Sequence, residues 1–351
     1  LKAQGGKTVD SVPVPQAALK QAGMAPMVAS PSCPVRWTAR RLEDGMVFFL
    51  SNFKKTGRFE ATLRVDCNEP ELFDPVTGEI LVADGVLDGT ARVASIVPEL
   101  AASAFGDATV RQVMDMTTGL AYSEDYSDPN ADIWKYSAAA SPLPKPADYA
   151  GPNGYFEYLQ TVRPDGAHGD AFHYKTINTD ALGWIISRVS GKEVTELLSE
   201  RIWSRMGAEQ DGYMTVDGKG TPFAGGGLSA GLRDLGRIGL LMLNEGEING
   251  QRLFPSQVVA NIRSGGSKEA FAKAGYKTLQ GGSYRGMWWL FHNGNGAFAA
   301  RGVHGQTIYI DPTADMVIVR LASFPTAKNA NIDPTSLPAY QAVAEYLLSK
   351  R

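Results

Sequence analysis

Cysteine and histidine are scarce in this chain of 351 residues, which has two cysteines and four histidines. Cys33 and Cys67 are too few for a disulfide-dense scaffold or a four-cysteine zinc site. A single bridge between them is compatible with the sequence, which does not establish it. His168, His173 and His292 lack ligand-like spacing and are expected at the surface or in packing contacts, so we predict no metal and no other cofactor.

The chain also lacks strong charge and long apolar runs. Its formal net charge is −3, and no long basic run compensates it, which argues against a nucleic-acid partner. No apolar run approaches the roughly 18 residues that span a bilayer, so no membrane span is predicted. Hydrophobic residues make up 44%, enough for a sizeable core, and we expect a soluble protein of bacterial type. The compartment stays open between cytoplasmic and exported.

Composition changes along the chain predict three parts. Residues 1–34 are rich in Pro, Ala, Gly and Ser and are expected to be a linker. Residues 35–79 form a β-rich segment, in which runs at 46–50 and 59–65 predict a hairpin. Residues 80–351 contain helical periodicity first, at 109–119, at 182–189 with Gly191 as the expected helix end, and at 232–243. Strand patterns follow at 286–292, 297–303, 307–310 and 316–322. This order predicts an α+β domain with an antiparallel sheet.

Two stretches of the third part point to a pocket. Residues 121–154 are long, polar and rich in proline and aromatics, which indicates an ordered cover rather than a plain connection. Residues 303–311 are predicted to be a strand that begins with a polar His304-Gly305-Gln306 step after Gly302. A polar step at the mouth of a buried strand places backbone N–H groups beside a cavity. The run Gly225-Gly226-Gly227 lacks the context of a phosphate cradle, and close backbone packing explains it better.

Several short motifs of this third part occur in a recognisable order. They are Thr109–Leu120, Tyr122-Ser123-Glu124-Asp125-Tyr126, Phe172–Asp180, Gly225–Ser229 and Val303-His304-Gly305-Gln306. Over about 270 residues the chain resembles serine hydrolases related to penicillin-binding proteins and class C β-lactamases. It is most similar to the 6-aminohexanoate-dimer (nylon-oligomer) hydrolase branch. The resemblance implies an antiparallel sheet with a helical domain, and transfer of an acyl group to a serine followed by hydrolysis of the acyl-enzyme.

The same resemblance implies a site. Tyr174 takes the place of the tyrosine that shares the proton relay, and a phenol with a reference pKa of about 10 needs a nearby cation for that role. His304 and Gly305 match the third motif, and the Val303 N–H on its strand is the expected oxyanion donor. The implied partner is a small amide or ester substrate, either a linear amide oligomer or a short ester. A homodimer is compatible with the family, but the sequence does not fix the oligomeric state.

The family's Ser-x-x-Lys motif has no counterpart at its expected place. Counting back from Leu81 leads to Asn68 and Glu71, which cannot act as the serine and the lysine of the motif. A Ser51-x-x-Lys54 match lies between strand runs and is more plausibly a chance match than a relocated pair. Asp74-Pro75 and Gly78 are expected to interrupt the helix that would carry the motif. The sequence therefore leaves three alternatives: a hydrolase, a ligand-binding scaffold without turnover, or a truncated or chimeric product.

Residues 35–79 carry a different likeness. The stretches Val35-Arg36-Trp37-Thr38 and 69–79 resemble a fragment of the C-terminal β-sandwich region of α-L-rhamnosidase-type glycoside hydrolases. No glycosidase active site accompanies them, so no such activity is inferred. We expect the predicted hairpin of this segment to take the place of the family's N-terminal strands, beside the strand at 316–322.

Overall fold

The computed structural model describes residues 76–351 and, before them, only the backbone of four strands. These strands are β1 (Val28–Ala29), β2 (Val35–Leu42), β3 (Gly45–Asn52) and β4 (Thr62–Leu63). By its internal contacts the chain divides into two units, Leu1–Glu69 with Ala322–Thr326, and Pro70–Leu321 with Ala327–Arg351. The expected boundary at residue 80 falls within the first helix of the second unit.

The first unit contains two separate two-stranded sheets. Strand β2 pairs antiparallel with β3 over eight residue pairs, from Val35↔Asn52 to Leu42↔Gly45, and β1 pairs with β4. The predicted partner of the 46–50 run was therefore wrong, since β3 pairs with the strand before it rather than with 59–65. Only two residues separate β2 from β3, and so short a connection closes the ladder at the least entropic cost. Cys33 and Cys67 lie outside the described residues.

The second unit contains the helices. They are α2 (Thr77–Ala83), α3 (Val93–Ile96), α4 (Val110–Met114), α5 (Asp132–Ala140), α6 (Tyr155–Thr161), α7 (Ile177–Ser190), α8 (Val194–Leu198), α9 (Leu232–Leu243), α10 (Ser256–Ser264), α11 (Lys268–Lys273) and α12 (Asp333–Leu348). Short helical turns lie at η1 (Pro98–Leu100), η2 (Ser199–Trp203), η3 (Lys277–Leu279), η4 (Val303–Gly305) and η5 (Asn329–Asn331). No helix in the described part of the chain has the length and apolar character needed to cross a membrane.

A five-stranded antiparallel sheet forms the base of this unit. Its order is β13-β12-β11-β10-β9, from β9 (Ser283–Arg285), β10 (Trp288–Leu290), β11 (Phe298–Arg301), β12 (Thr307–Asp311) and β13 (Met316–Arg320). Short hairpins pair β5 (Tyr213–Met214) with β6 (Leu228–Ser229), and β7 (Glu247–Ile248) with β8 (Gln251–Arg252). The predicted α+β class with an antiparallel sheet is thus confirmed.

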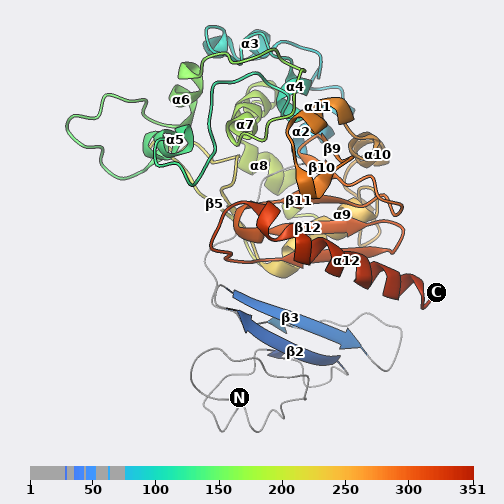
Figure 1. The fold of residues 1–351 in the computed structure, drawn as a ribbon. Helices are drawn as coiled ribbons and strands as arrows, with labels where there is room; N and C mark the ends of the chain where they lie inside the picture. The colour runs from blue at the N-terminus through green and yellow to red at the C-terminus, as the bar shows by residue number, and fades with distance from the viewer. Residues whose placement is uncertain (1–27, 30–34, 43–44, 53–61, 64–75) are drawn as a thin grey trace. The chain divides into compact units, whose positions relative to one another are not determined.

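Helices cover both faces of the sheet, as Figure 1 shows for α9 and α12. Along β12 the side chains of Ile308 and Ile310 belong to the apolar core that α9 completes. Tyr309 points to the other face, where its ring lies 5.0 Å from that of Tyr340 on α12. The strand is buried on both faces, which explains why its sequence is a nearly continuous β-branched and aromatic run.

Three local predictions need correction. The helix expected at 109–119 ends at Met114, because Met116 takes a left-handed conformation with φ 52°. Helix α2 continues through Gly78 instead of breaking there; a Cβ at Gly78 would lie 3.3 Å from Leu182 Cδ2, so the glycine permits close packing. Residues 121–154 contain helix α5 rather than a loop alone.

One edge of the sheet in the second unit is β13, which among the described strands pairs with β12. In the first unit β2 and β3 pair with each other. The expected pairing of the N-terminal hairpin with the strand at 316–322 stays a prediction.

Candidate active site

Tyr174 lies in the connection between α6 and α7, in an aromatic cluster on the sheet. Its ring stacks on Trp289 of β10, with centroids 5.6 Å apart and planes 23° apart, and meets the Tyr284 ring edge-on at 6.3 Å. Burial raises the pKa of Tyr174 well above its usual range, and Tyr284 and Glu124 raise it further. The phenol therefore stays protonated at neutral pH. A proton relay needs a nearby cation to lower this pKa, and no cation is among the main groups that shift it.

Glu124 fixes the backbone that carries Tyr174. Its carboxylate accepts the Thr176 N–H at 2.7 Å and the Thr176 hydroxyl at 2.5 Å. The Tyr126 hydroxyl donates to the same carboxylate at 3.0 Å. Two hydrogen bonds from one residue to a carboxylate hold that residue firmly, because bonds to charged groups are stronger than neutral ones. Sequence reasoning missed this role, although Glu124 lay in one of the matched motifs.

A second buried acid, Asp180, lies a few residues after Thr176. Asp180, in the first turn of α7, accepts the Tyr136 hydroxyl at 2.6 Å and the Gly225 N–H at 3.0 Å. A Cβ at Gly225 would lie 2.4 Å from Thr176 Cγ2 and 2.6 Å from Asp180 Oδ2, so only glycine fits. Close backbone packing was the predicted reason for this glycine run, and it is confirmed. Burial raises the pKa of Asp180 to about 7, although both hydrogen bonds oppose the shift.

The Val303–Gly305 motif forms a tight turn rather than the start of a strand. It is the η4 turn between β11 and β12, with left-handed φ values of 56° at His304 and 93° at Gly305. The expected strand at 303–311 therefore begins only at Thr307. The chain reverses direction here through positive φ angles. This conformation strains the backbone of His304, whereas Gly305, which has no Cβ, adopts it readily.

Hydrogen bonds from three sides fix this turn. The Gly302 N–H donates to Gln306 O at 2.9 Å, Asn329 Nδ2 to Gly302 O at 2.9 Å, and Arg320 Nε to Gly305 O at 2.7 Å. Within residues 76–351 no oxygen accepts the Val303 N–H, which begins the turn. A backbone donor held in place without an acceptor is the feature that an oxyanion site requires.

Trp289 joins the tyrosine to the turn. Tyr174 stacks on its ring, and the guanidinium of Arg301, two residues before Val303, lies 5.3 Å from the ring centroid. Arg301 is paired with Asp333, which also accepts the Thr278 hydroxyl at 2.7 Å. The structure thus brings Tyr174 and the turn to one part of the fold through a shared aromatic ring.

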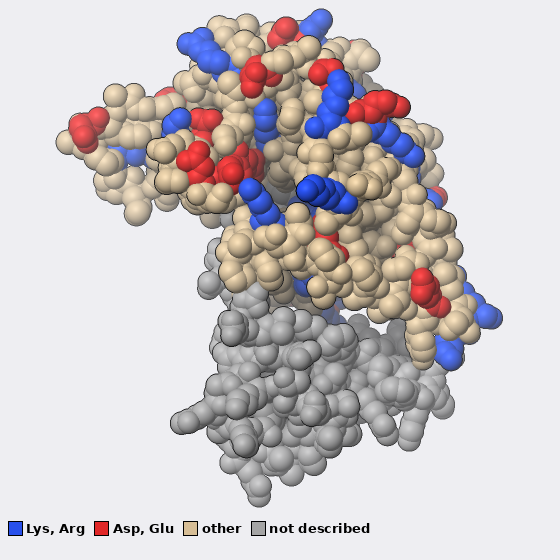
Figure 2. All heavy atoms as spheres, in the orientation of Figure 1, with Lys and Arg blue, Asp and Glu red and all other residues tan. Residues whose placement is uncertain are grey.

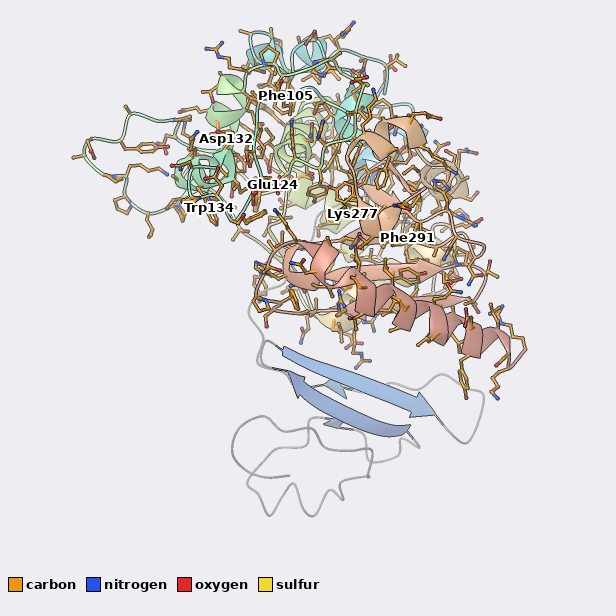
Figure 3. The ribbon with its side chains drawn as sticks, viewed as in Figure 1. Phe105, Glu124, Asp132, Trp134, Lys277 and Phe291 are labelled. Carbon is orange, nitrogen blue, oxygen red and sulfur yellow. The ribbon has the colours of Figure 1, made fainter. Side chains whose placement is uncertain are left out.

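The face beside this cluster is hollowed. Figure 2 shows the hollow between acidic and basic side chains, and Figure 3 places Glu124 on one side of it and Lys277 on the other. Lys328 Nζ, next to the turn-holding Asn329, lies 3.1 Å from Asp125 Oδ1. The hollow therefore has an acidic side chain, Glu124, on one side and a basic one, Lys277, on the other.

Other candidate groups lie elsewhere. A cavity of about 330 Å³ lies at the far end of β10 and β11, lined by residues that include Arg263, Glu245 and His292. His292 Nε2 and Ser283 Oγ are 2.7 Å apart, but Ser283 is fully buried and cannot meet a substrate. His168 bonds the Gly119 N–H and Asp107. Among the described residues no three His, Cys, Asp or Glu side chains gather as metal ligands would.

The first motif cannot be placed at its expected position. Asn68, Glu71 and Lys54 lie outside the described residues. Ser51 lies inside β3, paired with Arg36, and not at the start of a helix. Helix α2, where the family's motif helix would continue, instead buries Glu79, which is paired with Arg111.

Comparison with known proteins supports the resemblance of the second part. The sequence model of the family described as Beta-lactamase matches residues 76–338. The 6-aminohexanoate-dimer hydrolase of Paenarthrobacter ureafaciens is 38% identical over 250 residues, which are 70% of this chain and 62% of that protein. The chain therefore spans less than two thirds of that relative's length.

Solved structures agree on the fold. A Bacillus anthracis protein provisionally described as a 6-aminohexanoate-dimer hydrolase is 31% identical, with a TM-score of 0.73 over 83% of this chain and 76% of that one. A family VIII carboxylesterase, 17% identical, shares the fold with a TM-score of 0.54, over 90% of this chain and 93% of that one. The rhamnosidase-like stretch at 35–79 stays a prediction.

Proposed function

Since the chain belongs to the beta-lactamase family of serine hydrolases, we propose that it is a scaffold for cleaving small amides or esters, with its site at Tyr174 and the Val303–Gly305 turn. Linear amides and short esters are the proposed substrates. The 6-aminohexanoate-dimer hydrolase named above supports the amide part of this assignment. The observation that carries the proposal is the Val303 N–H, which has no acceptor among residues 76–351 and lies in a turn braced by Asn329 and Arg320.

The reaction has two steps. A serine oxygen attacks the carbonyl carbon, its proton passes to a base, and the developing oxyanion accepts the Val303 N–H. The C–N or C–O bond then breaks, and the leaving amine or alcohol takes up the proton. Water attacks the acyl-enzyme and releases the acid. Tyr174 would serve this scheme as a proton donor because its phenol is protonated at neutral pH, although its raised pKa makes it a weak acid in that role.

A second candidate is a scaffold that binds such compounds without turnover. The absence of serine and lysine at positions 68 and 71 favours it. So does the raised pKa of Tyr174, which makes this residue a poor base. The two candidates share one site and differ in the nucleophile.

Hydrolysis of a chromogenic short-chain ester and a chromogenic anilide tests the proposal. We expect turnover that survives in Tyr309→Phe, a buried phenol packed on α12, and falls about 100-fold in Tyr174→Phe, typical of losing a proton-transfer group. Loss of turnover in Ser51→Ala would identify Ser51 as the nucleophile. Saturable binding without turnover would establish the second candidate. Neither binding nor turnover, in a chain that melts cooperatively, would overturn the proposal.

A further inference from the structure

Arg301 lies at the end of β11, directly before the connection that contains the Val303–Gly305 turn. It is the last residue of β11 and pairs in register with Thr307, so these two residues frame the connection 302–306. The paired backbones of Arg301 and Thr307 therefore fix the two ends of the turn. Any movement of the Arg301 backbone would move the Val303 N–H two residues later.

The Arg301 side chain is held on two sides. The side chains of Arg301 and Asp333 are 6% and 5% exposed and form an ion pair. Its guanidinium also lies over the Trp289 ring at 5.3 Å, and that ring carries Tyr174. Arginine suits both contacts at once, because its planar fork can pair with a carboxylate while its face stacks on an aromatic ring.

Asp333 extends the same link toward the turn. It begins α12, just after the η5 segment from which Asn329 donates to Gly302 O at 2.9 Å. Burial raises the pKa of Tyr276 to about 12, and the nearby positive charge of Arg301 opposes this shift. The charge of Arg301 therefore acts on the aromatic wall formed by Tyr174, Trp289 and Tyr276.

We propose that Arg301 is a positioning residue, which locks the aromatic wall of Tyr174 and the Val303–Gly305 turn in one arrangement through Trp289 and Asp333. Its catalytic consequence rests on the proposed hydrolase function; its structural consequence does not. Arg301→Met leaves Asp333 buried without its cation and releases both the ring and the turn. Arg301→Lys keeps the charge but loses the planar stack.

Hydrogen exchange of the whole chain, resolved by peptide, tests this inference. Arg301→Met is expected to speed exchange within 302–306 at least about tenfold, as local opening would, and to leave α10 unchanged. Arg301→Lys should restore most of the protection. Arg237→Met is the matched control, because it removes an arginine that bonds Asp234 at 2.9 Å on α9, away from the turn. Unchanged exchange at 302–306 in Arg301→Met, or faster exchange throughout the unit, would overturn the proposal.

Kinetics separate this inference from the function on which it partly rests. If the wild-type chain hydrolyses the ester, Arg301→Met should lower kcat about tenfold or more with KM within about twofold, as loss of transition-state positioning does. An equal loss in Arg237→Met would contradict a positioning role. If the wild-type chain shows no turnover, the hydrolase proposal fails, and the exchange experiment still decides the role of Arg301. Should Arg301→Met not fold, Asp333→Asn replaces it in both measurements.

Discussion

Two groups of buried acids in the second unit are stabilised in different ways. Glu79 of α2 pairs with Arg111 of α4, and Asp115 Oδ2 lies 2.9 Å from Arg285 Nη1. Asp180 accepts hydrogen bonds from neutral donors, the Tyr136 hydroxyl and the N–H groups of Gly225 and Ala224. The first group is a network of opposite charges, and the second is a lone carboxyl in an aromatic shell.

The difference explains which group responds to pH. Burial raises the pKa of Asp115, but Arg285 and Arg111 oppose the shift. For Asp180, only hydrogen bonds oppose burial, and the pKa reaches about 7. Cations beside a buried acid favour its charged form, whereas Asp180, with neutral donors and a pKa of about 7, gains or loses its charge near physiological pH.

The largest expected effect comes from breaking the charged network. Glu79→Gln leaves the Arg111 guanidinium without its main partner, and removal of one member of a buried pair costs about 3–5 kcal/mol. Denaturant unfolding of the purified variant measures this loss. The double variant Glu79→Gln with Arg111→Met should recover much of it. A single variant within about 1 kcal/mol of wild type would contradict the strength of this network.

The lone carboxyl is expected to give stability a pH dependence. The folded-state pKa of Asp180 is raised from 3.8 to about 7. Its stabilising contribution is therefore full below pH 4 and is lost as pH rises through 7, on the order of 4 kcal/mol in total. Asp180→Asn removes this carboxyl and should flatten that part of the curve. Urea midpoints of both proteins from pH 4 to 8 measure it; parallel curves would refute the assignment.

Tyr136→Phe sharpens the same comparison. It removes the hydroxyl that donates to Asp180 Oδ2 at 2.6 Å, at an expected cost of about 1.5–3 kcal/mol when the carboxyl is charged. The cost should be larger at pH 8 than at pH 5, where Asp180 is mostly protonated. Tyr309→Phe, measured alongside, controls for the loss of a buried phenol elsewhere. An equal cost at both pH values would mean that the bond does not depend on the charge.

The smallest effect is expected at the exposed rim of the hollow. Lys328 and Asp125 are 58% and 44% exposed, and ion pairs so open to solvent add little to stability. Lys328→Ala should therefore change the melting temperature little, and less still in 0.5 M salt. A double-mutant cycle with Asp125→Ala measures the pair itself. A coupling as strong as that of the buried Glu79–Arg111 pair would contradict this expectation.

Much of the fold could be predicted from the chain because its signals are local. The residues of α9 repeat at helical spacing, and the prediction of 232–243 matches Leu232–Leu243. Gly191 was expected to end the helix before it and does so with φ 68°. The strand at 307–310 matched β12, since its β-branched and aromatic run occurs in strands buried on both faces. Each of these elements depends mainly on its own side chains.

The candidate site could be predicted only in part. Tyr174 and residues 303–305 stay predicted site residues, carried by motif resemblance. The bracing acids Glu124 and Asp180 were missed, because their partners Thr176, Tyr136 and Gly225 are brought to them only by folding. A proton relay needs a tyrosine whose pKa is lowered, but burial raises the pKa of Tyr174. A sequence motif does not reveal how deeply its residues are buried.

The sequence by itself determined the family-like second unit, its α+β class and the motif positions, because periodicity, glycine placement and motif order are properties of the chain. Only the tertiary structure decided that Val303–Gly305 is a braced turn, that Trp289 and Arg301 link it to Tyr174, and that one buried acid is paired while another is not. These outcomes depend on contacts between residues far apart in the chain. Burial and charge compensation arise from those contacts.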